Sequence, residues 1–578
     1  MGGIGAAGLG SAWLLACGGG QDSTPGGDSS AGAAATVVST AAVENVKTGG
    51  LYQFVLQNDP PSTDPFKHAS YVSQLAAGYP YSKLLKHKTG EGVRPNDFEV
   101  TEDLAESWQI TDPTTYTFKL RPGIRFHDVA PVSGRALDAQ DIVYSFERFM
   151  SISTYKGNVT PVIDKVEAPD TGTVVIKLKK PDADFLNILA DGLTSTVYVF
   201  PKEAENYDTI KTVIGTGAWL FDSLQPGIAT TWKRNPNYFL KDSMGRPLPY
   251  LDQIKALTIP EYAQQLAQFQ AGNIHLLSPK APDLGSLRQA VPGHELLAFD
   301  IPLTFQIFAF RQIGAGSTSP FNDERVRRAV SMSIDRDGLI DTLSNDSFYK
   351  AEGLEIQKPW HNIVGAGLTR WWLDPKAAME KGEEWAKWYK YDVAEAKKLL
   401  AAAGYANGFE AEYHRTVKIY GDTYDDAAEA FVPMLDAVGI KTKVQVHDYS
   451  SKFFPDIYSK GDYAGMGNIL QSFSTPGQTL FALYHPDGPF NRNKWNDPQV
   501  VDLIQKQGEE LDFEARKNLV YEAQKYISNT MHNVPLLQQS WTGYTIGWPF
   551  VKNWRFYRNG SNSYAWGSQA HLYYWLDK

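Results

Sequence analysis

The sequence predicts a large mixed α/β protein, and three observations predict it. Its 578 residues exceed what one ordinary hydrophobic core accommodates, so two or more compact parts are expected. Apolar residues alternate with polar ones in several short runs, as in strands, and recur every three to four residues in others, as in helices. The chain is 43% apolar and contains 28 Phe, 30 Tyr and 15 Trp, which suits well-packed cores.

The N-terminal residues 1–17 predict a lipoprotein signal peptide. Residues 1–16 carry no charged side chain, are rich in Gly, Ala and Leu, and end in Leu14-Leu15-Ala16. The next residue, Cys17, is the single cysteine of the chain. This pattern is similar to a bacterial lipobox, so Cys17 is the expected lipidation site, and the alternative is a free or buried thiol. No Lys or Arg precedes the apolar run, which fits a start upstream of Met1.

Residues 18–50 predict a flexible tether. They are mostly Gly, Ser, Thr, Ala and Pro without sustained periodicity, so they cannot bury enough surface to fold. A flexible chain of this length has an r.m.s. reach of about 30 Å. A lipid, a tether and a globular body in that order predict an extracytoplasmic protein, in the periplasm or on the cell surface, anchored to the membrane by lipid.

The first strands of the body follow the tether. Residues 51–56 form an apolar run typical of a buried strand, and Asp59-Pro60-Pro61 ends it. Trp108 and Ile110 alternate with polar residues, and residues 116–120 resume the alternation after a turn. These two runs predict a β-hairpin.

Helices follow with recognisable ends. Residues 138–149 begin with a capping-box-like pair of aspartates, and residues 262–272 and 392–404 each end at a glycine. A further helical pattern over 428–439 also ends at a glycine. It is followed at once by strict alternation over 440–446, which predicts a helix that leads directly into a strand.

Composition excludes several classes of function. Acidic residues outnumber basic ones by 65 to 55, giving a net charge of −10, and no basic run occurs, so nucleic acid is not an expected partner. A single cysteine excludes an intrachain disulfide and any cysteine-based structural metal site. The histidines show no helical two-histidine spacing. Neither a metal site nor a cofactor is therefore expected.

No catalytic residue is predicted. The sequence lacks the serine nucleophile elbow, the zinc-protease helix motif, the phosphate-binding loop and the calcium loop. His127-Asp128 follows a strand, where a solvated turn pair is the ordinary interpretation. Asp182 and Asp184 precede Phe185, where the charge at a helix N-terminus explains them. We therefore expect a protein that is not an enzyme.

Nine short segments between residues 50 and 555 carry a family resemblance through their order and spacing. They are DPPSTDP (59–65), DLAESW (103–108), YTFKLRPGIRFHD (116–128), AQDIVYS (139–145), GTGAW (215–219), RNPNY (234–238), FQAG (269–272), VRRAV with IDR (326–336) and AKKLLAAAGY (396–405). Together they resemble the extracellular solute-binding proteins of family 5, the dipeptide- and oligopeptide-type receptors of ATP-binding cassette importers.

The resemblance implies a two-lobed fold of the periplasmic-binding-protein type, class II, in its large three-subdomain form. Subdomain Ia would comprise 51–78, 213–300 and 541–578, subdomain Ib 79–212, and lobe II 301–540. The two crossings near 300 and 540 would act as a hinge beside an inter-lobe cleft. The expected partners are a small-molecule or peptide solute and the membrane permease of the importer, and a monomer is expected.

The resemblance also implies which residues contact solute. Each aromatic among them has core packing as the alternative explanation. The candidates are Phe66, Tyr79, Tyr81, Phe310, Trp360, Gln471, Ser472, Phe473, Ser474 and Trp541.

The loop 471–476 departs from the family pattern. Peptide-binding members carry two aspartates here, the first of which pairs with the amino terminus of the peptide, whereas this chain has Ser472 and Thr475. A buried ammonium without a counter-charge is costly. A peptide remains the main expectation, and an oligosaccharide or other neutral solute, a sensor role and an extracytoplasmic hydrolase are the alternatives. An acidic residue from elsewhere could also replace the missing pair.

Overall fold

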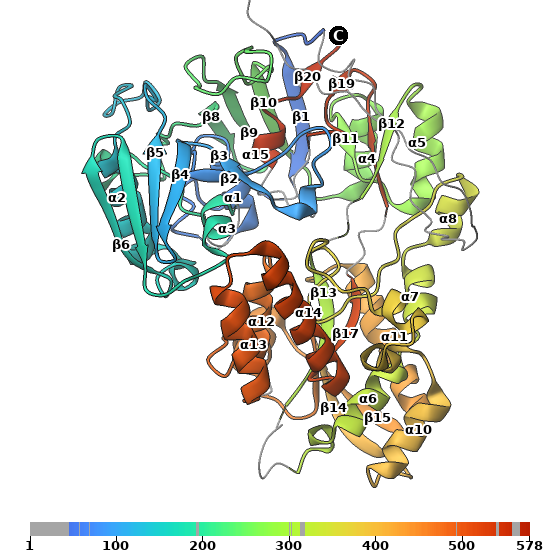
Figure 1. The fold of residues 1–578 in the computed structure, drawn as a ribbon. Helices are drawn as coiled ribbons and strands as arrows, with labels where there is room; N and C mark the ends of the chain where they lie inside the picture. The colour runs from blue at the N-terminus through green and yellow to red at the C-terminus, as the bar shows by residue number, and fades with distance from the viewer. Residues whose placement is uncertain are drawn as a thin grey trace, which may run out of the picture. The chain divides into compact units, whose positions relative to one another are not determined.

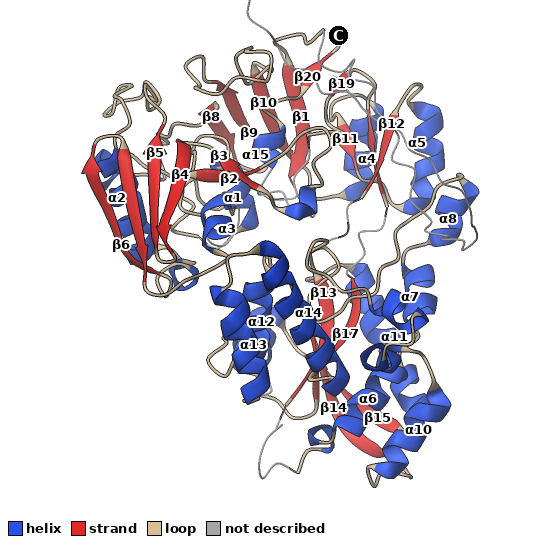
Figure 2. Ribbon diagram, in the orientation of Figure 1, coloured by secondary structure: helices blue, strands red, loops and turns tan. Residues whose placement is uncertain are grey.

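The structure is a computed structural model, and it describes residues 45–578 except 57, 69, 192–195, 300, 302, 312–317, 493, 539–542 and 558–566. Helices and strands follow one another throughout this part, so the predicted mixed α/β class is confirmed (Figures 1 and 2). The predicted signal peptide with Cys17, most of the tether and Trp541 lie outside the described residues.

The strands fall into several sheets. They are β1 (Leu51–Leu56), β2 (Leu85–His87), β3 (Val100–Glu102), β4 (Ala105–Asp112), β5 (Thr115–Leu120), β6 (Ile163–Asp170), β7 (Thr173–Leu178), β8 (Trp219–Gln225), β9 (Ala229–Arg234), β10 (Gln253–Thr258), β11 (Leu276–Leu277), β12 (Glu295–Ala298), β13 (Phe305–Phe310), β14 (Phe409–Arg415), β15 (Ile440–Val446), β16 (Met466–Gln471), β17 (Asn533–Gln538), β18 (Tyr544–Gly547), β19 (Val551–Lys552) and β20 (Trp575–Leu576).

The α-helices lie between these strands in the chain. They are α1 (Tyr71–Ala77), α2 (Ala139–Ile152), α3 (Phe185–Ala190), α4 (Tyr262–Gln270), α5 (Leu284–Ala290), α6 (Glu324–Met332), α7 (Arg336–Leu343), α8 (Asp346–Ala351), α9 (Pro375–Glu380), α10 (Val393–Ala402), α11 (Asp422–Val438), α12 (Pro476–Tyr484), α13 (Pro498–Glu509), α14 (Phe513–Thr530) and α15 (Gly567–Ala570). Two short 3₁₀ helices, η2 (Pro95–Asp97) and η7 (Glu384–Tyr389), border the sites described below.

One sheet brings the start of the body together with later segments. Strand β1 pairs in parallel with β10, and β9 and β8 continue the sheet in antiparallel order. Near the end of the chain, β18 pairs with β11 and β12. Residues at the end of the predicted tether also contact this body, because Lys47 Nζ lies 2.6 Å from Asp577 Oδ1.

A second, antiparallel sheet has the order β4-β5-β7-β6. Its first two strands are the predicted hairpin, in which Trp108 pairs with Phe118, and that prediction is confirmed. Helix α2 contacts β6 and β7 and buries Ile142 and Phe146. Its N-terminus has the predicted capping box, since Asp138 accepts the backbone N–H of Asp141 and its own N–H reaches the Asp141 carboxylate.

The third sheet has the order β15-β14-β16-β13-β17 and is covered on both faces. Alternate residues of β13 enter two cores: Phe308 and Phe310 one of them, Phe305 and Ile307 the other. The first core includes residues of α6, α10 and α11, and the second includes residues of α13 and α14. Strand β15 follows α11 after Gly439, whose φ is +100°, as the sequence predicts.

Among the described residues, the strands of each sheet come from a single part of the predicted division of the chain. The strands of the third sheet all come from 301–540, and those of the second all come from 79–212. The division into subdomains itself stays a prediction. Within the described residues, no helix combines the length and the apolar character that crossing a membrane requires.

Candidate functional site

The loop 471–476 joins β16 to α12. Its first residue, Gln471, is buried, and in the orientation that satisfies both groups its carboxamide oxygen accepts from Arg492 Nη1 at 3.1 Å and Nη2 at 3.2 Å. Arg492 is itself buried, and burial lowers the pKa of its guanidinium. Its Nη1 also donates to the carbonyl of Phe490. Arg492 therefore holds the carboxamide oxygen of Gln471, and the contact of this residue with solute stays a prediction.

The middle of the loop presents neutral groups. Ser472 is exposed, and Phe473 and Ser474 are half-buried. The Ser474 hydroxyl donates to Gln478 Oε1 at 3.1 Å, and the Phe473 ring lies 6.5 Å from the Phe490 ring. Hydroxyl groups beside an aromatic face can bind polar, uncharged parts of a solute.

The end of the loop meets a carboxylate from another part of the chain. Thr475 caps α12 by accepting the N–H of Gln478 at 3.1 Å, and its hydroxyl donates to Asp184 Oδ2 at 2.6 Å. Arg516 Nη2 lies 2.6 Å from Asp184 Oδ1, and both side chains are less than a tenth exposed. The carboxylate is therefore neutralised by an arginine and is not a free counter-charge for an ammonium.

Asp184 lies at a helix N-terminus as the sequence predicts, but that position alone does not account for its side chain. Asp184 occupies the N-cap position of α3, but its side chain makes no capping hydrogen bond there and instead binds Arg516 and Thr475. Asp182 Oδ1 accepts the N–H of Asp184 at 2.8 Å. The partners of Asp184 lie about 300 residues away in the chain. No local pattern signals them.

The predicted aromatic contacts before residue 300 lie in hydrophobic cores. The rings of Phe66 and Tyr81 lie 5.1 and 4.5 Å from that of Phe200. The Tyr79 hydroxyl makes a 2.8 Å hydrogen bond with His571 Nδ1 in a separate core. Core packing, the alternative explanation, describes all three side chains, and their contact with solute stays a prediction.

Phe310 and Trp360, two of the predicted aromatic contacts after residue 300, share one core. Phe310 stacks on Phe321 with ring centroids 4.8 Å apart. Trp360 donates its indole N–H to Asp337 Oδ1 at 2.8 Å, and Lys376 Nζ lies 5.3 Å from its ring. The structure therefore groups Phe310 with Trp360, and groups Gln471 to Ser474 in the loop, without joining the two groups.

The carboxyl ends of β14, β15 and β16 lie at one edge of the third sheet, because these strands run parallel. Ligands of open α/β sheets bind at such edges. Arg415 ends β14, and its Nη2 lies 3.1 Å from Glu429 Oε1, while its buried Nε and Nη1 have no hydrogen-bond partner among the described residues. Thr416 donates to the carbonyl of His447 at 3.1 Å. Sequence reasoning missed these residues, whose one signal is a polar run directly after an alternating strand.

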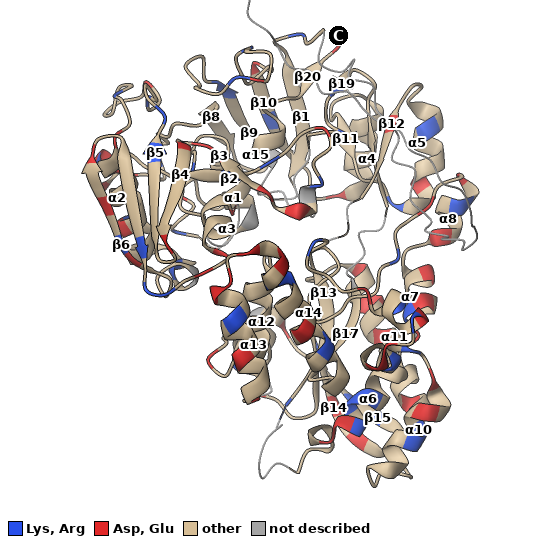
Figure 3. Cartoon of the chain, in the orientation of Figure 1, with Lys and Arg blue, Asp and Glu red and all other residues tan. Residues whose placement is uncertain are grey.

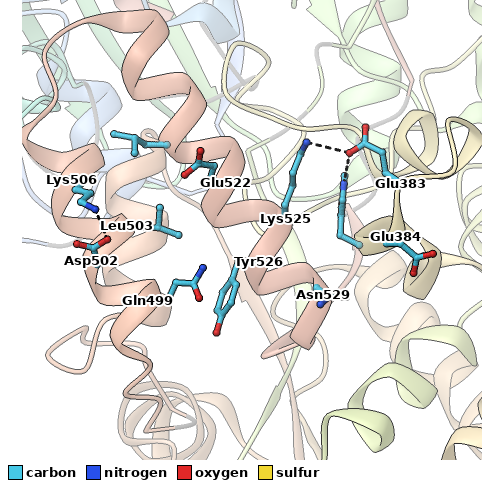
Figure 4. Close-up of a pocket in the computed structure, with 12 residues that line it drawn as sticks. Glu383, Glu384, Gln499, Asp502, Leu503, Lys506, Glu522, Lys525, Tyr526 and Asn529 are labelled. Atoms are coloured by element: carbon cyan, nitrogen blue, oxygen red, sulfur yellow. Dashed lines mark hydrogen bonds and ion pairs between the residues drawn. The ribbon is translucent and has the colours of Figure 1, made fainter.

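A surface groove of about 710 Å³ lies between η7, α13 and α14 (Figure 4). Its two lysines are paired, Lys525 with Glu383 at 3.3 Å and Lys506 with Asp502 at 2.7 Å. Both signs of charge are interspersed on α10 and α13 as well (Figure 3). All lining residues fall between 383 and 529, inside the predicted lobe II, and none of them is a predicted solute contact.

The interpretation of His127-Asp128 as a solvated turn pair is wrong for the histidine. His127 is 2% exposed, its Nε2 lies 3.0 Å from the carbonyl of Gly217, and its Nδ1 accepts the N–H of Gly215. Burial lowers the pKa of His127 to about 4, whereas Asp128 is exposed. The described residues hold no group of three or more His, Cys, Asp or Glu side chains that could bind a metal ion.

A family model decides what kind of protein this is. The model of the bacterial extracellular solute-binding proteins, family 5 Middle, matches residues 99–491. The chain belongs to this family. Family 5 consists of binding proteins that act outside the cytoplasm, so the chain is an extracellular solute-binding protein.

Several relatives are similar over most of the chain. The glutathione-binding protein GsiB of Shigella flexneri is 26% identical over 485 residues, 80% of this chain and 83% of that protein. The probable D,D-dipeptide-binding periplasmic protein DdpA of Escherichia coli K12 is 24% identical over 494 residues, 84% of this chain and 87% of that protein. Heme-binding protein A of Haemophilus influenzae is 27% identical over 398 residues, 64% of this chain and 65% of that protein.

Solved structures establish the fold. The periplasmic binding protein DppA from Helicobacter pylori, in complex with the peptide STSA, has a TM-score of 0.69 and 23% identity and covers 92% of this chain and 99% of its own. HbpA2 from Haemophilus parasuis has a TM-score of 0.72 and 21% identity and covers 92% of this chain and 100% of its own. The solute-binding protein described here therefore has the predicted two-lobed periplasmic-binding-protein fold.

Proposed function

We propose that this protein captures a peptide-class solute between its two lobes and delivers it to the permease of an ATP-binding cassette importer. The family match over 99–491 carries the proposal, because it spans most of both predicted lobe segments. The names of two relatives, a glutathione-binding protein and a probable D,D-dipeptide-binding protein, support a peptide-class solute. A ligand that touches both lobes stabilises the closed state by its differential affinity for that state.

The solute-facing loop of the proposed site offers no negative charge. Residues 471–476 contain no carboxylate, and Asp184, which reaches Thr475, is already paired with Arg516. We propose that Ser472 and Ser474 bind polar groups of the solute and that Phe473 packs against an apolar part of it. The peptide would therefore bind without an ammonium anchor at this loop.

The proposed location follows from the N-terminal sequence. We propose that Cys17 carries a lipid and that residues 18–50 tether the binding domain outside the cytoplasmic membrane. The protein would act there as a monomer and would bind its solute without transforming it. Lipidation at one cysteine supplies more than one acyl chain, and about 0.8 kcal/mol per buried CH₂ then gives stable anchoring.

Isothermal titration calorimetry tests the proposed solute class. Di- to pentapeptides, the same peptides with N-acetylated termini, and oligosaccharides are titrated into the purified protein. We expect micromolar or tighter binding of a subset of peptides, with N-acetylation changing Kd by less than about tenfold, since no carboxylate of the loop contacts the terminus. Abolition by N-acetylation would show an ammonium anchor and overturn the account of the loop. Binding of oligosaccharides alone would overturn the peptide class.

A further inference from the structure

Asp184, Arg516 and Thr475 form a junction between two distant segments of the chain, which we name the Asp184 junction. Asp184 lies in 79–212, and its two partners lie in 301–540. Each carboxylate oxygen takes one partner, Oδ1 from Arg516 Nη2 and Oδ2 from the Thr475 hydroxyl, both at 2.6 Å. The side chains of Arg516 and Asp184 are 5% and 8% exposed.

Further hydrogen bonds and a close approach at a glycine surround the Asp184 junction. Ala183 donates its N–H to the carbonyl of Gly508 at 2.8 Å, and Arg516 Nη1 donates back to the carbonyl of Ala183 at 3.0 Å. Arg516 also donates to Gln507 Oε1 through Nε and Nη2. A Cβ at Gly477 would lie 2.2 Å from Asp184 Oδ2, so the close approach depends on glycine there.

A second contact supports the same pair of segments. The side chain of Asn96, in η2, donates to the carbonyl of Ile301 at 2.6 Å, and the Thr369 hydroxyl donates to Asp97 Oδ1 at 3.0 Å. The next residue, Phe98, is 7% exposed and packs in the core that contains Phe305. Phe98 has a φ of +49°, a left-handed backbone conformation that is uncommon for a bulky residue. The segment 79–212 therefore contacts 301–540 at two separate points.

An ion pair suits a contact that forms and breaks. Removing one partner of a buried pair leaves the other charge uncompensated, whereas separating the whole pair lets water hydrate both groups. The pair is therefore stable in contact and can part without a large penalty. Thr475 links α12 and the loop before it to this pair, because its hydroxyl donates to Asp184 and accepts the N–H of Gln478.

We propose that Asp184 is a positioning residue for solute binding: through Arg516 and Thr475 it holds the 471–476 loop in the conformation that faces the solute. The loop keeps this conformation only while the segments 79–212 and 301–540 are in contact. Closure of the lobes would then order the loop, and opening of the lobes would release it. This inference rests on the proposed function for the identity of the site, but its contacts are independent of any solute.

Hydrogen–deuterium exchange tests the effect on the loop without a ligand. The reporter is the first turn of α12, where the N–H of Gln478 binds the Thr475 hydroxyl. We expect Asp184→Asn to raise exchange there at least tenfold. Asp242→Asn is the matched control, because Asp242 is 4% exposed and pairs with Arg246 within one segment. The control should leave exchange in α12 as in the wild type.

A second pair of variants and a distance measurement keep the proposal falsifiable. Thr475→Val removes the hydroxyl and Thr475→Ser keeps it, so only the valine variant should raise exchange. The distance between the two segments is measured with spin labels at K211C and K398C in a Cys17→Ser background. The native lysine side chains at these positions are 83% and 74% exposed. Asp184→Asn should broaden the distance distribution between them, and Asp242→Asn should not.

Unchanged exchange in α12 together with an unchanged distance distribution in folded Asp184→Asn would overturn the proposal. Equal exchange in the valine and serine variants would overturn it as well. Neither experiment contains solute, so their failure leaves the proposed peptide class standing. The peptide class is tested separately, by the calorimetric titrations.

Discussion

Asp64→Asn should destabilise the protein strongly, because Asp64 is the centre of a buried ion pair. Its side chain is fully buried, and Arg148 Nη2 lies 2.5 Å from Oδ2. The Thr209 hydroxyl and the N–H of Phe66 also donate to the carboxylate. The guanidinium of Arg148 lies over the ring of Phe200 at 4.6 Å. An asparagine cannot supply the charge that balances this arginine.

The expected loss follows from the rule for breaking one side of a buried pair, about 3–5 kcal/mol in free energy of unfolding. Burial alone raises the pKa of Asp64, but the hydrogen bonds and charge of Arg148 outweigh it, so the folded-state pKa lies below the ordinary value. A lowered carboxyl pKa gives stability that is present above the unfolded pKa, about 3.9, and is lost as the pH falls through the folded pKa.

Urea denaturation of the wild type and the variant, followed by tryptophan fluorescence, measures this loss. We expect the difference in unfolding free energy to be full at pH 7 and to shrink below pH 4. Asp128→Asn is the control, because Asp128 is exposed and should change stability by less than about 0.5 kcal/mol. A difference below 1 kcal/mol between Asp64→Asn and the wild type at pH 7 would refute the reasoning.

Two further predictions concern the lipid anchor and Asp182, which lies next to the Asp184 junction. Cys17→Ser should move the protein from the membrane to the soluble fraction, since loss of the acyl chains removes the anchoring energy, and a membrane-bound variant on fractionation would contradict lipidation. Burial, followed by the charge of Asp184, raises the pKa of Asp182 to about 6. Because the folded-state pKa exceeds the unfolded one, ionised Asp182 lowers stability at pH 7. Asp182→Asn should therefore raise the free energy of unfolding at pH 7 by up to about 2–3 kcal/mol. The gain should shrink as the pH falls from 6 to 4, and its absence in urea titrations at pH 7 would contradict the burial argument.

Local signals predicted the elements well. The aspartates at 138 and 141 form the capping box that the sequence indicates, because such a cap uses residues three apart. Gly439 ends α11 in a left-handed conformation, and the alternation that follows is β15. The apolar run 51–56 is β1 with the predicted bounds. These features depend on neighbours in the chain, so one sequence suffices to read them.

The site was less predictable because its contacts are long-range. Asp184 and Arg516 are 332 positions apart in the chain, and only folding brings them together. His127 is buried and forms hydrogen bonds with Gly215 and Gly217, which belong to a later segment. Aromatic residues are also ambiguous in sequence, since core and cleft both require large rings, and Phe66 is in a core.

Small-angle X-ray scattering tests the central claim most directly, namely that solute is captured between two lobes that close on it. The protein is measured alone and at saturation with a peptide whose binding has been established by titration. A closing two-lobed receptor should show a smaller radius of gyration with peptide, because the ligand favours the closed state. A radius of gyration that stays the same at saturation would contradict capture by lobe closure.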